Sequence, residues 1–122
     1  MSTLKTSNIQ DTSGNNNSTP AEISQGRAKV WVSFNGTGTV AITDSFNVSS
    51  ITDTGTGQYT VNFTTAFANS NYAVSHGATF STGDGYYHWY DNESANSIGI
   101  RFIHTGGAYI DPAHVSCVVH GD

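Results

Sequence analysis

The stretch DGYYHWYDN, residues 84–92, concentrates the side chains of this sequence that are best suited to binding chemistry. Its five consecutive ring-bearing residues are Tyr86, Tyr87, His88, Trp89 and Tyr90. Carboxylate and amide groups flank this run at Asp84, Asp91, Asn92 and Glu93. Tyr and Trp rings suit sugar rings, because flat ring faces cover apolar C–H groups while polar tips form hydrogen bonds. The stretch therefore predicts a contact surface, first for a neighbouring subunit and second for a glycan.

The period-two geometry of a β-strand divides this run between two faces. One face carries Tyr86, His88 and Tyr90, and the other carries Tyr87 and Trp89. Only one face of a strand can join the core of a single sandwich. We therefore expect the other face to meet solvent, a neighbouring subunit or a ligand, and the sequence leaves open which face is buried.

The histidines all lie in the C-terminal half of the chain, at His76, His88, His104, His114 and His120. Zinc sites need converging ligands, and these residues lack the compact spacing of such sites. We expect structural or surface roles and no metal or other cofactor, with a site shared at an oligomer axis as the alternative. The turn TGDG, residues 82–85, lacks the spacing of a calcium loop and is predicted to be a polar turn.

Catalytic motifs are missing from the sequence: it contains no G-x-S-x-G, H-E-x-x-H, P-loop or Rossmann fingerprint. Ser75 and His76 are adjacent, so a strand would point them to opposite faces and prevent a direct dyad. Cys117 stands alone in a strand-like run and is predicted to be a small core side chain. We therefore expect no catalytic residue and a protein that is not an enzyme.

The composition argues against nucleic acids and membranes as partners. Only four residues are Lys or Arg and the formal net charge is −5, which argues against nucleic acid. No apolar run approaches the roughly 20 residues that span a bilayer, so we expect no membrane insertion. The chain has 122 residues and is 36% hydrophobic, so its core looks underfilled for a monomer. We therefore expect several copies of the chain to form an oligomer.

Residues 1–26 are predicted to form an extended N-terminal arm for attachment or oligomer contacts. Its apolar anchors are few: Leu4, Ile9 and Ile23. The low-complexity segment SGNNNSTP cannot build a core. The segment TPAEIS predicts one helical turn, with Thr19 as the cap, Pro20 at the first position and Glu22 three residues after the cap.

Residues 27–122 are predicted to form one all-β domain, an antiparallel β-sandwich or jelly-roll-like fold. Apolar residues alternate along roughly eight short segments separated by Gly, Asn and Asp turns. The clearest alternating sets are Val30, Val32 and Phe34; Tyr59, Val61 and Phe63; Ile98, Ile100 and Phe102; and Val115, Cys117 and Val119. Phe46 and Val48 are predicted to share one face of a single strand that precedes the turn TGTG.

Residues 1–75 resemble a family of small structural proteins from marine tailed bacteriophages of the cyanophage type, described as tail-fibre-like or virion proteins. The resemblance lies in STLKTSNIQDTSG, in STPAEISQGRAKVWVSFNGTGTVAI and in SFNVSSITDTGTGQYTVNFTTAFANSNYAVS. It implies a β-rich, homotrimeric virion protein like other phage fibres and knobs. The aromatic run lies outside the resembling part.

From this resemblance we expect a homotrimeric tail fibre, spike or knob subunit on the exterior of the phage particle. The expected partners are further copies of the chain, other virion proteins through the N-terminal arm, and a host cell-surface glycan at the aromatic run. The alternative is a capsid decoration, cement or head-fibre protein that stabilises the virion. In that case the arm would lie across capsid subunits, and the aromatic run would serve contacts within the oligomer.

Overall fold

The computed structural model describes residues 1–80 and 85–122, so Asp84 and most of the TGDG turn lie outside the described residues. The described residues form one short helix and eight strands: α1 Pro20–Gly26, β1 Val30–Asn35, β2 Ala41–Phe46, β3 Val48–Gly55, β4 Gln58–Phe63, β5 Ala73–Thr79, β6 Tyr86–Asp91, β7 Ser97–His104 and β8 His114–His120. The prediction of an all-β domain is confirmed.

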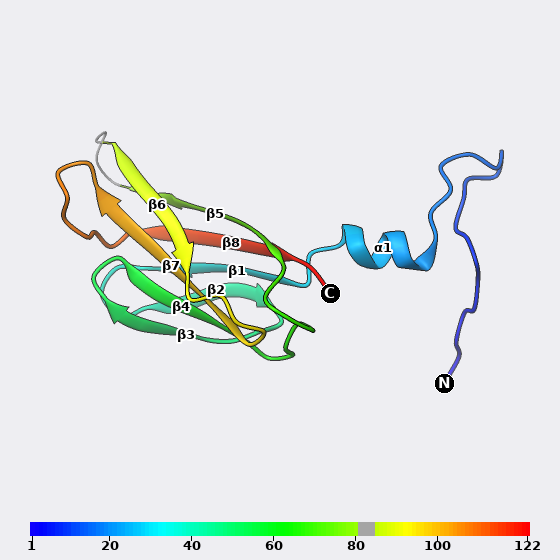
Figure 1. Cartoon of the computed structure of the whole chain (residues 1–122), viewed down its shortest axis with the longest axis horizontal. Helices are drawn as coiled ribbons and strands as arrows, with labels where there is room; N and C mark the ends of the chain where they lie inside the picture. Colours follow the sequence, from blue (N-terminus) through cyan, green and yellow to red (C-terminus); the bar gives the residue numbers. More distant parts are fainter. Residues whose placement is uncertain (81–84) are drawn as a thin grey trace.

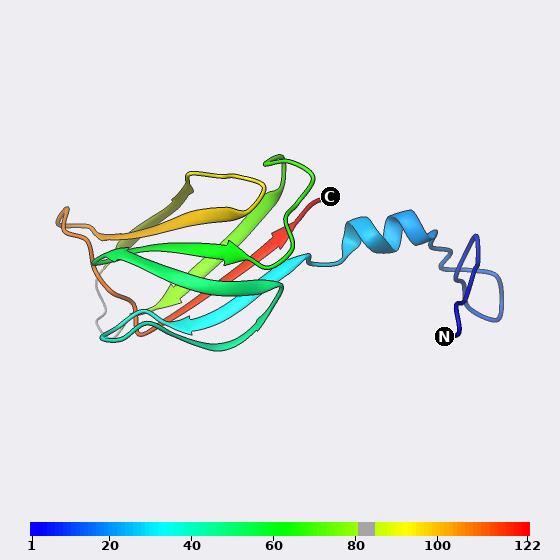
Figure 2. The same ribbon diagram turned by 90° about the horizontal axis from the view of Figure 1, so that it is seen from below.

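The strands form two four-stranded sheets that pack as a sandwich (Figures 1 and 2). One sheet has the strand order β2-β1-β8-β5, and the other has the order β3-β4-β7-β6. All neighbouring strands pair antiparallel. The predicted antiparallel β-sandwich is therefore confirmed, and β5 and β6 are edge strands of different sheets.

The core lies between the four inner strands, β1, β4, β7 and β8. Each contributes alternate side chains, and the buried set is Val30, Val32, Phe34, Tyr59, Val61, Phe63, Ile98, Ile100, Phe102, Val115, Cys117 and Val119, with Phe67 from a loop. These are the alternating residues expected from the sequence, because successive strand residues point to opposite faces. Cys117 is buried as predicted, and burial raises the pKa of its thiol to about 12.

The expectation for Phe46 and Val48 is wrong. They belong to β2 and β3, strands of different sheets that meet at Asn47. Asn47 has a φ of 57°, which Asn tolerates better than most residues. Its Nδ2 donates to the carbonyl oxygens of Lys29 (3.1 Å) and Thr65 (3.0 Å). The sequence pattern did not reveal this corner, because Phe46 and Val48 keep the two-residue alternation across Asn47.

The segment before β1 extends away from the sandwich (Figures 1 and 2). The predicted helical turn is confirmed as α1, where the Glu22 backbone N–H donates to Thr19 Oγ1 (3.2 Å) and the Thr19 N–H donates to Glu22 Oε2 (2.7 Å). Leu4, Ile9 and Ile23 are exposed. The division at residue 26 and the role of this segment stay predictions. No helix in the described parts of the chain is long and apolar enough to cross a membrane.

Candidate functional site

The aromatic run forms β6, which pairs with β7 along one side and lies at the edge of its sheet. Its two faces divide as predicted. The inner face carries Tyr86, His88 and Tyr90, because the ring of His88 lies 6.1 Å from that of the core residue Phe102. This face is only partly covered: Tyr86 is half-buried, whereas His88 and Tyr90 are exposed. The edge position explains this, because β6 has a paired strand on one side and opens to solvent on the other.

Tyr86 is the anchored member of the inner face. Its ring stacks on Phe80 with the centroids 3.5 Å apart and an interplanar angle of 8°. Phe80 in turn contacts the core residue Phe102, with 6.0 Å between their centroids. Tyr86 therefore extends the core outward and is less available to a ligand than the rest of the run.

A groove of about 440 Å³ separates the two edge strands and is lined by Val74, Ser75, His76, His88, Trp89 and Tyr90. Across it, the rings of His76 and His88 lie 4.6 Å apart at 81°, with 3.5 Å between His88 Nδ1 and His76 Nε2. Burial, and then the neighbouring His88, lower the pKa of His76 to about 4. Sequence spacing missed this pair because the two residues meet across sheets, twelve positions apart.

The outer face of β6 joins a row of side chains that crosses three segments. Tyr87 pairs with Ile103 of β7, and Ile103 pairs on its other side with Tyr109. Directly paired residues project on the same face of a sheet. Tyr87, Trp89 and Tyr109 thus share one exposed surface, which we call the outer aromatic surface; Tyr87 is its most open member, 64% exposed.

Trp89 and Tyr109 lean toward each other over β7. Their segments flank β7, which places their backbones about 10 Å apart, yet their ring centroids are 6.2 Å apart at an angle of 47°. The two rings form an angled platform. Sequence analysis missed Tyr109, because this residue follows β7 in an irregular segment and only the bridge to Ile103 brings it to the surface.

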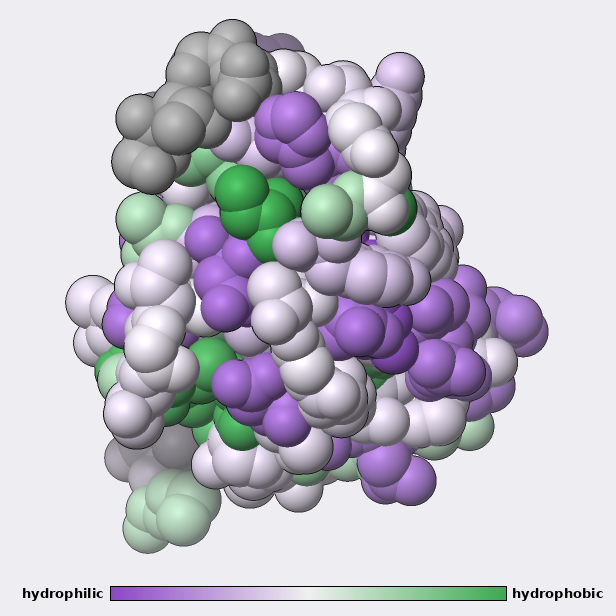
Figure 3. All heavy atoms as spheres, turned by 90° about the vertical axis from the view of Figure 1, so that its left-hand side faces the viewer, coloured by the Kyte–Doolittle hydropathy of each residue, from purple (hydrophilic) through white to green (hydrophobic). Residues whose placement is uncertain are grey.

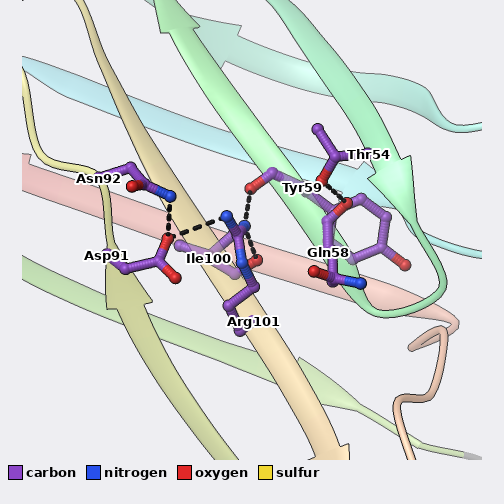
Figure 4. Close-up of polar contacts among 7 residues, drawn as sticks. All are labelled: Thr54, Gln58, Tyr59, Asp91, Asn92, Ile100 and Arg101. Atoms are coloured by element: carbon purple, nitrogen blue, oxygen red, sulfur yellow. Dashed lines mark hydrogen bonds and ion pairs between the residues drawn. The ribbon is translucent and has the colours of Figure 1, made fainter.

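Beside this platform, a fixed carboxylate completes the outer face (Figure 4). Asp91 Oδ1 lies 2.9 Å from Arg101 Nη2 and accepts a hydrogen bond from Asn92 Nδ2 (2.9 Å). Arg101 Nη1 donates to the carbonyl oxygens of Tyr59 (2.9 Å) and Ile100 (3.0 Å). Arg101 was not predicted as a site residue. A lone arginine in an otherwise apolar strand was the available signal.

Gly99 makes room for this ion pair. A Cβ at this position would lie 2.4 Å from Asp91 Oδ1 and 2.9 Å from Arg101 Nη2. A side chain at this position would force the ends of the Asp91 and Arg101 side chains to shift. Gly99 of β7 therefore leaves the space that the Asp91 carboxylate occupies beside Arg101.

A second hollow, of about 510 Å³, lies at the end of the sandwich next to α1. Its lining residues include Arg27, Lys29, Phe46, Phe67 and Asp122. It is larger than the groove at β6, but it contains no residue of the aromatic run. It lies where the N-terminal segment joins the sandwich, away from the outer aromatic surface.

The predicted site residues therefore fall into separate groups. The run from Tyr86 to Asp91 is brought together with Arg101 and Tyr109, whereas Leu4, Ile9 and Ile23 lie on the segment outside the sandwich (Figure 1). At the end of the sandwich opposite α1, small green hydrophobic patches stand among pale and purple side chains (Figure 3). The surface at that end is therefore mostly polar.

Two further histidines make contacts with nearby protein groups. His114 Nε2 lies 2.7 Å from Ser33 Oγ, and His104 Nδ1 accepts a hydrogen bond from the Gly106 N–H (2.9 Å). Among the residues that the structure describes, no three His, Cys, Asp or Glu side chains gather around one point.

Comparison with known proteins gives a likeness of fold. No family model and no curated protein matches the chain. A solved structure that does match is the phiAB6 tailspike, crystallised in complex with three-repeated oligosaccharides of Acinetobacter baumannii surface polysaccharide. The TM-score is 0.60 at 15% sequence identity, and the match covers 93% of this chain but 22% of the tailspike chain. The chain is thus similar in fold to one part of a phage tailspike.

Proposed function

We propose that this chain is a structural subunit of a phage virion, in a tail fibre or spike, and that its outer aromatic surface contacts a host cell-surface glycan. The observation that carries the proposal is the angled pair of Trp89 and Tyr109 beside the fixed carboxylate of Asp91. The fold likeness to a tailspike solved with a surface oligosaccharide supports it. The resemblance of residues 1–75 to marine phage proteins supports the same assignment.

The geometry suits a hydroxylated ring. Two exposed aromatic faces can cover the apolar C–H side of one sugar, because aromatic side chains combine a large apolar face with a polar tip. Oδ1 of Asp91 makes the contacts with Arg101 and Asn92, so Oδ2 can accept hydrogen bonds from sugar hydroxyls. The ion pair with Arg101 holds this carboxylate in place. The proposed role is binding and not catalysis.

A homotrimer fits this role. The N-terminal segment exposes three apolar residues within one chain, Leu4, Ile9 and Ile23. Neighbouring copies or another virion protein would cover them. Several copies on one particle would bind the same surface polymer together. Avidity then makes a site of roughly millimolar affinity useful, since linked sites gain about 10²–10⁴ in effective affinity.

A capsid decoration or head-fibre protein is the second candidate. The observation in its favour is that α1 buries none of its residues against the sandwich and carries the exposed Ile23. A helix of seven residues is marginal alone, so it needs a surface to pack on. Imaging of labelled protein on intact virions separates the candidates, because the label would mark the tail in one case and the capsid in the other.

The glycan contact is tested with the full-length protein on an array of host-surface polysaccharides, followed by calorimetry with the best ligand. We expect Trp89→Ala and Tyr109→Ala each to lower the affinity by about tenfold. Trp31→Ala is the matched control, because Trp31 is similarly exposed but lies on β1 of the other sheet. Binding that is indifferent to both site changes, or equally sensitive to the control, would contradict the proposal.

A further inference from the structure

The groove between β5 and β6 marks the open side of the sandwich. Strand β5 pairs with β8 and strand β6 pairs with β7, and each has its other edge facing the groove. His76 and His88 face each other across it from the two sheets. They are thus in a position to link the two sheets across this open side.

The distance between the two imidazoles is long for a hydrogen bond and well suited to a shared ion. His88 Nδ1 and His76 Nε2 are 3.5 Å apart, beyond the usual 2.7–3.2 Å range for nitrogen donors. Two metal–nitrogen bonds of about 2.0–2.1 Å that span this separation meet at about 115°, close to a tetrahedral angle. The T-shaped rings, with centroids 4.6 Å apart, would have to turn so that both nitrogens point at one ion, and the exposed His88 is free to do so.

The chemistry of the pair selects the class of ion. Imidazole nitrogen suits zinc, nickel and copper, whereas calcium and magnesium take oxygen ligands. The described residues supply no third His, Cys, Asp or Glu nearby, so the remaining coordination positions would be filled by water. The groove of about 440 Å³ has room for these waters.

We propose that His76 and His88 bind one divalent transition-metal ion, such as Zn²⁺ or Ni²⁺, and that this ion clamps edge strand β5 to edge strand β6. Because two protein ligands hold it, the ion exchanges with solvent. The clamp supports β6 along its unpaired side. Strand β6 carries Trp89 and Tyr87 on its outer face. The site needs no bound glycan, so it stands whether or not the outer aromatic surface binds one.

The test is a titration of the full-length protein, stripped of metal with a chelator, with NiCl₂ and with ZnCl₂ at pH 7.5. Calorimetry should show one ion bound per chain, and the melting temperature should rise with metal concentration. His88→Gln should lower the affinity at least about tenfold, the scale seen when metal sites lose supporting groups. His120→Gln is the matched control, because His120 is an exposed residue at the end of β8, and it should leave the affinity unchanged.

A spectroscopic readout locates the ion. Trp89 is adjacent to His88 in β6 and borders the groove although its ring lies on the outer face, so bound Ni²⁺ should quench its fluorescence at this short range. The measurement uses a Trp31→Phe background, which removes the other tryptophan. The quenching should disappear in His88→Gln and in His76→Gln. His88 is exposed at an edge strand and its ring lies beside the core residue Phe102, so circular dichroism has to verify that His88→Gln keeps the fold. An absence of binding to the unaltered protein, or equal binding and quenching in His88→Gln, would overturn the site.

Discussion

Arg101 Nη2 lies 2.9 Å from Asp91 Oδ1 on the outer face of the β3-β4-β7-β6 sheet. Arg101 is only 8% exposed, and its other contacts are two backbone carbonyl groups. A nearly buried guanidinium is costly unless a partner neutralises it. This ion pair therefore joins β6 to β7 through side chains and fixes the carboxylate beside Trp89.

Gly99→Ala should destabilise the protein by about 1 kcal/mol, because the ends of the Asp91 and Arg101 side chains must shift and their ion pair weakens. The added Cβ would lie 2.4 Å from Asp91 Oδ1 and would push the carboxylate away from Arg101. Urea denaturation measures the free energy of unfolding. Gly77→Ala in β5 is the control, because a Cβ there meets no atom within 4 Å, and it should change stability by less than about 0.5 kcal/mol. Equal effects of the two changes would contradict the steric argument.

Asp91→Asn should lower the free energy of unfolding by about 1–2 kcal/mol, because Arg101 loses its counter-ion. The figure lies below that for a fully buried pair, since the Asp91 side chain is 37% exposed and water screens it. Asp44→Asn is the control: Asp44 is exposed on β2, and its described contact is to the neighbouring Ser45 N–H. Thermal and urea unfolding of both variants provide the comparison. If both lose the same stability, the ion pair has no special role.

Cys117 should be unreactive in the folded protein. Burial raises the pKa of its thiol to about 12, so the nucleophilic thiolate is scarce at neutral pH. A thiol-specific disulfide reagent should label it only under denaturing conditions. Rapid labelling without denaturant would show that the core opens readily.

The same thiol predicts a loss of stability in alkali. Above about pH 9 the unfolded chain releases the thiol proton while the folded chain keeps it, so the free energy of unfolding falls as pH rises. The contribution reaches up to about 1.4 kcal/mol per pH unit. A Cys117→Ala variant, whatever its stability at pH 7, should lose less between pH 8.5 and 10. Parallel stability curves for the two proteins would contradict this.

Removal of residues 1–26 should leave the sandwich folded and abolish oligomerisation. None of the buried core residues comes from this segment, whereas its exposed Leu4, Ile9 and Ile23 are available to other chains. Light scattering after size-exclusion chromatography should give a trimer for the full chain and a monomer for the truncated one. A full-length chain with all three apolar residues changed to Ser controls for length and should also be monomeric. A truncated chain that remains trimeric would place the subunit contacts on the sandwich.

The local pattern of the sequence was enough to predict the fold class and most of the core. Alternating residues such as Val30, Val32 and Phe34 became the buried faces of their strands, because side-chain direction in a strand depends only on its two-residue period. The same rule correctly divided Tyr86, His88 and Tyr90 from Tyr87 and Trp89. The helical turn followed from Thr19, Pro20 and Glu22, whose capping contacts lie within four residues.

Contacts between distant segments were decided only by the tertiary structure. Strand order places β6 at an edge, which explains why His88 and Tyr90 remain exposed although they face the core side. Pairing across sheets or strands brings His76 to His88, Arg101 to Asp91 and Tyr109 to Trp89. A period along one strand carries no information about which strand lies beside it. The sequence therefore determined which face each side chain occupies, and the register and strand order determined which residues meet there.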